Sequence, residues 1–105
     1  MADYFQRIGP AFQDGKATRL DLARGRALFA GLNCFEPGQT QAIHAHAGAD
    51  KFYFVVSGKA RIAVGSASEL VTAGTFVWAP ADVPHGVTEV VERTVLLVAI
   101  APPPG

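Results

Sequence analysis

Short hydrophobic runs separated by glycine and proline form the most regular pattern in the chain. Runs rich in Val, Ile, Phe and Thr recur about every eight to twelve residues, and helical periodicity is nearly absent. This pattern is typical of an all-β sandwich or barrel. We therefore expect strands at Thr18–Ala23, Arg26–Phe35, Gln41–His46, Phe52–Ser57, Ala60–Val64, Ser68–Thr72, Thr75–Trp78, His85–Thr88 and Thr94–Ala101.

Turn residues between the runs indicate how these strands connect. Ser57-Gly58-Lys59 predicts a hairpin turn, and Ala73-Gly74 predicts a second tight turn. Pro80 and Pro84 cannot lie inside central strands, so the segment between them is expected to be a loop. The whole chain is expected to form one domain, 1–105, with an N-terminal arm (1–16), a barrel (17–101) and a proline-rich tail (102–105).

The composition fits a folded domain and narrows the classes of partner. Of the 105 residues, 50% are hydrophobic and 17% are charged, which argues against disorder. Nine basic side chains balance nine acidic ones, so nothing attracts a phosphate backbone and nucleic acid is not an expected partner.

The same features predict a soluble, cytoplasmic protein with no membrane partner. Cys34 is the single cysteine, so an intrachain disulfide cannot form, which fits a reducing compartment. The first residues lack the basic and apolar regions of a signal peptide. The longest apolar run, Val95–Ala101, is too short to span a bilayer.

The three histidines are the strongest chemical signal. His44 and His46 are two residues apart, and alternate residues of a strand point to the same face. His85 lies in a later block that a β-barrel can fold back beside the first. Three imidazoles gathered in this way could bind one metal ion.

The spacing around His44 and His46 resembles the first motif of the cupin family. That motif is a glycine, five residues, HxH, three or four residues, an acid, six residues and a glycine. Here Gly38, His44, His46, Lys51 and Gly58 stand at those places. Every spacing fits, but a lysine replaces the acid.

The second block resembles the second cupin motif. That motif is a glycine, five residues, a proline, a variable residue, a glycine, two residues, a histidine, three residues and an asparagine. Gly74, Pro80, Asp82, His85 and Glu89 stand at those places. Asp82 replaces the second glycine and Glu89 replaces the asparagine.

The resemblance implies a jelly-roll β-barrel, or double-stranded β-helix, with a metal site inside it. His44, His46 and His85 carry over as ligands of a divalent transition metal, and imidazole suits Fe, Ni, Zn, Mn and Cu alike. The carboxylate ligand of the motif does not carry over, because Lys51 occupies its place.

Three interpretations of Lys51 remain open. In the first, Lys51 points inward with a lowered pKa and acts as a base or holds an anionic substrate. In the second, the strand slips locally and Asp50 supplies a fourth metal ligand. In the third, no metal binds, and Lys51 pairs with Asp50 or Glu89.

The residues after Lys51 predict one inward and one outward row. Tyr53 shares the face of Lys51, so it is either a core residue or a hydroxyl donor to a substrate. Phe52 and Phe54 point the other way, and outward aromatic side chains on a small barrel need a cover. We therefore expect a homodimer.

These observations favour a metal-dependent enzyme of the dioxygenase, isomerase or decarboxylase class acting on a small anionic or polar molecule. Lys51 and Tyr53 are the candidate catalytic residues. The alternatives are a sensor module that binds a small ligand or a metal without catalysis, and a metal-free cupin with a degenerate site. The fold hosts many chemistries, so the motifs do not name the substrate.

Overall fold

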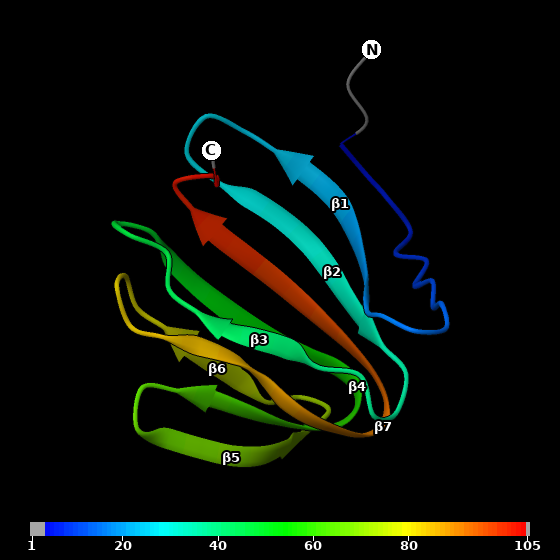
Figure 1. Ribbon diagram of the computed structural model, residues 1–105. Coiled ribbons are helices and arrows are strands. Elements are labelled where there is room, and N and C mark those ends of the chain that lie inside the picture. The colour runs from blue at the N-terminus through cyan, green and yellow to red at the C-terminus, as the bar shows by residue number, and fades with distance from the viewer. Residues whose placement is uncertain (1–3, 105) are drawn as a thin grey trace.

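The computed structural model describes residues 4–104, which form seven β-strands and no helix. The all-β prediction is confirmed. The strands, coloured in chain order in Figure 1, are β1 (Thr18–Arg24), β2 (Phe29–Phe35), β3 (Gln41–His44), β4 (Asp50–Val64), β5 (Ala67–Thr72), β6 (Phe76–Ala79) and β7 (His85–Ala101).

All strand pairs are antiparallel, and the long strands β4 and β7 connect the two halves of the fold. The first half of β4 pairs with β6 and with the second half of β7, which also pairs with β2. The second half of β4 pairs with β5 and with the first half of β7, which also pairs with β3. The result is a curled framework whose edge strands include β1 and β3 (Figure 1).

The hairpin predicted at Ser57-Gly58-Lys59 is wrong, because this segment lies inside β4. Its register with β7 shifts on both sides of Gly58, so the glycine marks an irregularity where the strand bends. The φ angle of Gly58 is 97°, and an added Cβ would meet the carbonyl oxygen of Arg93. Glycine is therefore required at this position for a conformational reason, which its sequence pattern did not separate from a turn.

The C-terminal strands also merge. The predicted strands His85–Thr88 and Thr94–Ala101 are parts of one strand, β7. The tight turn predicted at Ala73-Gly74 is present, with the Thr75 amide donating to the Thr72 carbonyl at 3.2 Å. It joins β5 and β6, which pair with different halves of β4 and not with each other.

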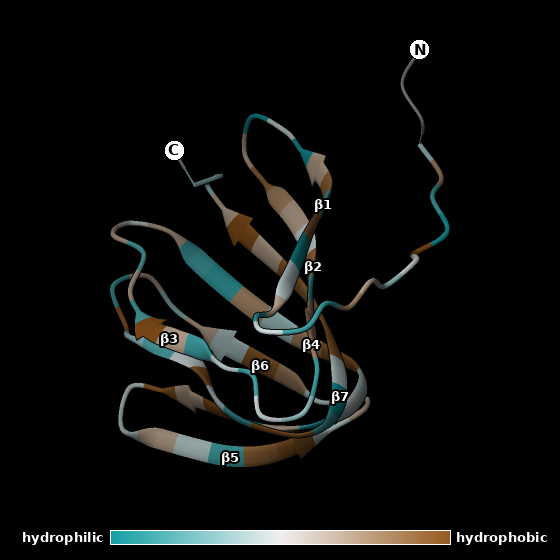
Figure 2. Cartoon of the chain, turned by 45° about the vertical axis from the view of Figure 1, so that its right-hand side comes forward, coloured by the Kyte–Doolittle hydropathy of each residue, from teal (hydrophilic) through white to brown (hydrophobic). Residues whose placement is uncertain are grey.

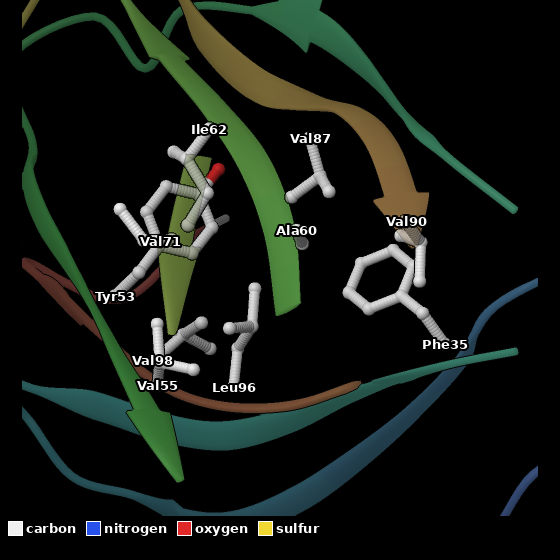
Figure 3. Close-up of a cluster of buried hydrophobic side chains, with 10 residues drawn as sticks. All are labelled: Phe35, Tyr53, Val55, Ala60, Ile62, Val71, Val87, Val90, Leu96 and Val98. Carbon is white, nitrogen blue, oxygen red and sulfur yellow. The ribbon is translucent and has the colours of Figure 1, made fainter. Parts of the chain in front are cut away.

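The main core fills the space between the two halves. Along β4 and β7, hydrophobic residues recur over most of each strand (Figure 2). Figure 3 shows their buried side chains pointing toward one another, with Tyr53 among the aliphatic groups. The cluster consists of Phe35, Tyr53, Val55, Ala60, Ile62, Val71, Val87, Val90, Leu96 and Val98.

A second, smaller cluster lies on the other face of β2 and β7. It consists of Leu32, Cys34 and Val95, and Phe12 from the N-terminal segment packs against it. Burial raises the pKa of the Cys34 thiol, as expected for a structural cysteine.

The segments at the two ends of the described chain contact the sheets in different ways. The segment before β1 is tied to that strand by a hydrogen bond of 2.8 Å from the Gln6 side chain to the Leu22 carbonyl, while Tyr4 and Phe5 on it are exposed. At the other end, Arg24 donates a hydrogen bond of 2.8 Å to the carbonyl of Pro104. The parts of the predicted arm and tail at positions 1–3 and 105 lie outside the described residues. Within residues 4–104, no helix capable of crossing a membrane was found.

Candidate metal centre

The fold brings His44, His46 and His85 together. His44 is the last residue of β3 and His85 is the first residue of β7, and the two are partners in the β3–β7 register. The three side chains can each offer a ring nitrogen such that all three nitrogens lie within 4.8 Å of one another. Neighbouring ring centroids are 4.6–5.3 Å apart.

Backbone hydrogen bonds set the tautomers of two of these rings. The Nδ1 atom of His44 lies 2.7 Å from the carbonyl oxygen of Ala42, and Nδ1 of His85 lies 3.0 Å from that of Val83. A carbonyl can only accept, so each Nδ1 must carry the proton. The Nε2 lone pair of each neutral ring is then free to bind a metal.

Two of the Nε2 atoms are buried without a hydrogen-bond partner. These atoms belong to His46 and His85, and no described residue satisfies either of them. A buried polar atom without a partner costs about 1–3 kcal/mol, so native proteins rarely retain one without a reason. A metal ion between the three rings would satisfy both atoms, so the residues present fit such an ion.

His46 reaches the cluster by a different route from the one predicted. β3 ends at His44, so His46 lies in the following loop and not on the strand. Its carbonyl accepts hydrogen bonds from the amides of Ala49, at 3.4 Å, and Asp82, at 3.1 Å. The Asp82 side chain in turn accepts a bond of 3.1 Å from the Gly48 amide. These bonds tie the His46 loop to the segment that precedes His85.

The environment favours the neutral form of two of the three imidazoles, those of His46 and His85. Burial lowers the pKa of His85 to about 4, and the nearby positive charge of Lys51 acts in the same direction. Burial also lowers the pKa of His46, again with a contribution from Lys51. Metal ions bind the unprotonated ring, so protons compete weakly for this site at neutral pH.

Lys51 points inward, as the motif register implied. It is 3% exposed, and its Nζ atom lies 4.5 Å from the centroid of the Tyr53 ring. Burial lowers the pKa of Lys51 to about 8, with a smaller contribution in the same direction from the charge of Arg19. No carboxylate within residues 4–104 forms an ion pair with it.

Asp50 and Glu89 are occupied elsewhere. Asp50 is exposed and accepts a hydrogen bond of 2.9 Å from the Ala81 amide, and it is not part of the group of ligand atoms. The register of Asp50 and Lys51 with β7 continues without a slip. Glu89 forms an ion pair with Arg61, with 3.6 Å between Oε1 of Glu89 and Nε of Arg61. Neither carboxylate therefore pairs with Lys51 here.

Tyr53 lies beside His85 in the candidate metal centre. It is fully buried, and its ring centroid is 6.0 Å from that of His85. The hydroxyl donates a hydrogen bond of 2.7 Å to Oε1 of Gln41. Burial raises the pKa of the Tyr53 hydroxyl well above its usual range, so this group stays protonated.

A comparison with known proteins identifies the family. The model of the cupin domain matches residues 31–100, which include all three histidines. The chain belongs to the cupin family. An uncharacterized protein of Streptomyces coelicolor is 38% identical over 84 residues, which cover 80% of this chain and 79% of that protein.

Solved structures confirm the jelly-roll cupin fold. TT1209 from Thermus thermophilus has a TM-score of 0.85 and 31% identity, covering 90% of this chain and 91% of that one. An RmlC-like cupin from Desulfovibrio desulfuricans has a TM-score of 0.83 and 24% identity, covering 99% of each chain. The latter likeness shows the fold alone.

The structure also explains why this cupin can carry aspartate where the motif has its second glycine. Asp82 has a φ angle of 70°, a left-handed conformation that glycine adopts freely. Aspartate is among the few other residues that tolerate this region. The substitution therefore keeps the turn and adds the side-chain bond to Gly48.

A cavity of about 620 Å³ opens beside the histidines of this cupin. His44, His46 and Lys51 line it together with residues that sequence reasoning did not assign to the site, namely Arg19, Asn33 and Gln41. Gln41 is an odd number of residues from His44, so strand alternation places it on the opposite face. A register shift between the two residues, where β3 has one extra residue, brings Gln41 to the cavity.

Proposed function

We propose that this cupin binds one divalent transition metal through His44, His46 and His85 and is a metal-dependent enzyme acting on a small anionic or polar molecule. The observation that carries the proposal is the pair of buried, unpartnered Nε2 atoms of His46 and His85. Three neutral nitrogen ligands leave further coordination positions open, which a catalytic metal needs and a structural zinc does not.

The protein groups around the histidines support a binding site for a small anion. When bound, a divalent metal with open positions would act as a Lewis acid or present dioxygen to a substrate. Lys51 places a positive charge beside the histidines, and its lowered pKa suits it to hold an anion or to exchange a proton near neutral pH. Tyr53 fixes Gln41 through its hydroxyl and forms part of the wall of the site.

The test of metal binding is elemental analysis of protein purified without added metal, followed by zinc titration. About one transition ion per chain is expected in the wild type, and both His44→Gln and His46→Gln should lose it. Asp50→Asn is the matched control and should retain the ion, because its carboxylate bonds to Ala81 instead. Well-folded wild type that holds no ion, even after soaking, would overturn the proposal.

The variant Lys51→Glu tests the orientation of Lys51 in the same assay. It restores the carboxylate of the family motif beside the three histidines, so its metal content should equal or exceed that of the wild type. Loss of metal from Lys51→Glu, with metal present in the wild type, would contradict the inward orientation.

Activity separates an enzyme from a sensor. Oxygen uptake and substrate loss would be measured for the metal-loaded cupin across small diketones, thiols and hydroxy acids. Turnover that disappears in His44→Gln supports the enzyme, whereas tight ligand binding without turnover favours the sensor. We further propose a cytoplasmic location, which the single buried thiol of Cys34 supports.

A further inference from the structure

Arg19 and Asn33 form a polar pair across β1 and β2, in which Arg19 is exposed and Asn33 is buried. They are direct partners in the β1–β2 register, and such residues have Cβ atoms about 4.5–5.5 Å apart. Both line the cavity that reaches His44 and His46, and both also line an adjoining cavity of about 210 Å³. A molecule in either cavity would contact this pair.

The pair offers hydrogen-bond donors that the described protein does not use. Asn33 is 4% exposed, and its amide makes no side-chain hydrogen bond within residues 4–104. Gln41 lines the same two cavities, and because its Oε1 accepts the Tyr53 bond, its Nε2 remains to donate. Together with the Arg19 guanidinium, these amides form a set of donors suited to an acceptor-only group.

The charges that line the cavity also favour an anionic ligand. Its charged lining residues are Arg19, Arg24 and Lys51, opposed by a single carboxylate, Asp21. Arg24 is already engaged, because it donates to Pro104 and lies over the Phe29 ring. Arg19 has no ion pair within the described chain, and it is close enough to lower the pKa of Lys51. An anion beside Arg19 would relieve this repulsion.

We propose that Arg19 and Asn33, with Gln41, form a subsite for a carboxylate, and that the ligand of this cupin is a small organic diacid. One acidic end would lie at Arg19 and the other at the histidines. This orientation rests on the proposed function, whereas the Arg19 subsite does not. Val98 and Ile100 also line the cavity and offer an apolar surface for a short carbon skeleton.

The test is calorimetric titration of malonate, succinate and glutarate into metal-free and zinc-loaded protein, with succinamide as the neutral analogue. At least one diacid should bind the zinc-loaded wild type more tightly than succinamide. Arg19→Gln should weaken that binding about tenfold or more, because a charge-assisted bond is lost. Arg26→Gln removes an equal charge from the β1–β2 loop, outside the cavity, and should change affinity by less than about twofold.

The outcomes separate this proposal from metal binding. If zinc binds at one per chain but Arg19→Gln and Arg26→Gln behave alike, the subsite is wrong and the metal site stands. If no zinc binds but a diacid binds the metal-free protein through Arg19, the subsite stands and the metal site is wrong. Failure of all three diacids to bind, or tighter binding of inorganic phosphate than of every diacid, would overturn the carboxylate assignment.

Discussion

The Lys51 ammonium group lies among buried side chains, 4.5 Å from the centroid of the Tyr53 ring. Burying a charge without a partner is unfavourable, and the pKa of about 8 expresses this cost. A shift of this size from the ordinary value corresponds to roughly 3 kcal/mol. The side chain therefore weakens the fold at the place where the cavity would bind a ligand.

Replacing Lys51 by methionine should stabilise the metal-free protein at pH 7 by about 2 kcal/mol, because it removes the buried charge and keeps a similar side-chain volume. The free energy of unfolding would be measured by urea denaturation in the presence of a chelator. The control is Lys59→Met. Lys59 is a half-buried lysine further along β4 and outside this cavity, so its replacement should change stability little.

The same variant should show a defined pH dependence. The folded-state pKa of Lys51 is lowered, so between pH 8 and 10.5 the unfolded chain binds more protons than the folded one. The free energy of unfolding of the wild type therefore rises with pH across that window, and the difference in stability between Lys51→Met and the wild type should shrink. An advantage that is constant from pH 7 to 10.5, or a methionine variant that is less stable at pH 7, would contradict the buried charge.

Single residues of the site were predictable where the strand is regular. Alternation along β4 correctly placed Lys51 and Tyr53 inward and Phe52 outward. It could not place Gln41, because the register shift in β3 reverses the face. Nor could it single out Arg19 and Asn33, whose pairing depends on the β1–β2 register and not on any local motif.

At the scale of elements, the approach of β3 to β7 positions two of the histidines. An added Cβ at Gly86 would lie 2.8 Å from the carbonyl oxygen of Gln41 and 2.9 Å from that of Ala42. Both contacts are to backbone, so the strands would have to separate. Gly86 follows His85 directly, and separation of the strands would therefore displace His44 from His85.

Gly86→Ala should lower zinc affinity about tenfold or more and destabilise the fold by about 1–3 kcal/mol through overpacking. Zinc titration and urea denaturation would measure the two effects. Gly74→Ala is the matched control, because its φ of 90° strains an alanine while nothing lies within 4 Å of the added Cβ. It should lose stability but keep zinc affinity. Equal zinc affinity in both variants would show that the β3–β7 approach does not set the site.

Element boundaries were predicted less well than element types, for a specific reason. Glycine near the middle of β4 has the same sequence signature whether the chain reverses or bends. Only the long-range pairing of β4 with β7 decides between them, and this pairing joins segments such as Lys59 and Glu92. The paired cupin motifs, in contrast, placed the three histidines at fixed offsets that the fold brings together.

At the scale of the whole molecule, an aromatic surface lies on the outer face of β4 and β6. Phe52 is the partner of Trp78, and Phe54 is the partner of Phe76, with the rings of Phe52 and Phe76 centred 5.2 Å apart. Phe76 is 57% exposed and Trp78 is 50% exposed. Leu97 on β7 continues this outer face, because it is the partner of Phe54. Large exposed aromatic groups gathered in this way are typical of an interface.

We propose that a second copy of the chain covers this surface, so the wild type should sediment as a dimer at micromolar concentration. Trp78→Glu should convert it to a monomer, because a charge would be buried at the contact without a partner. Leu70→Glu alters another exposed apolar residue, on β5, and should leave the dimer intact. Trp78 is the single tryptophan, so its emission should shift to longer wavelength as the wild type is diluted and dissociates. A wild-type monomer with unchanged emission at every concentration would leave the aromatic surface without this role.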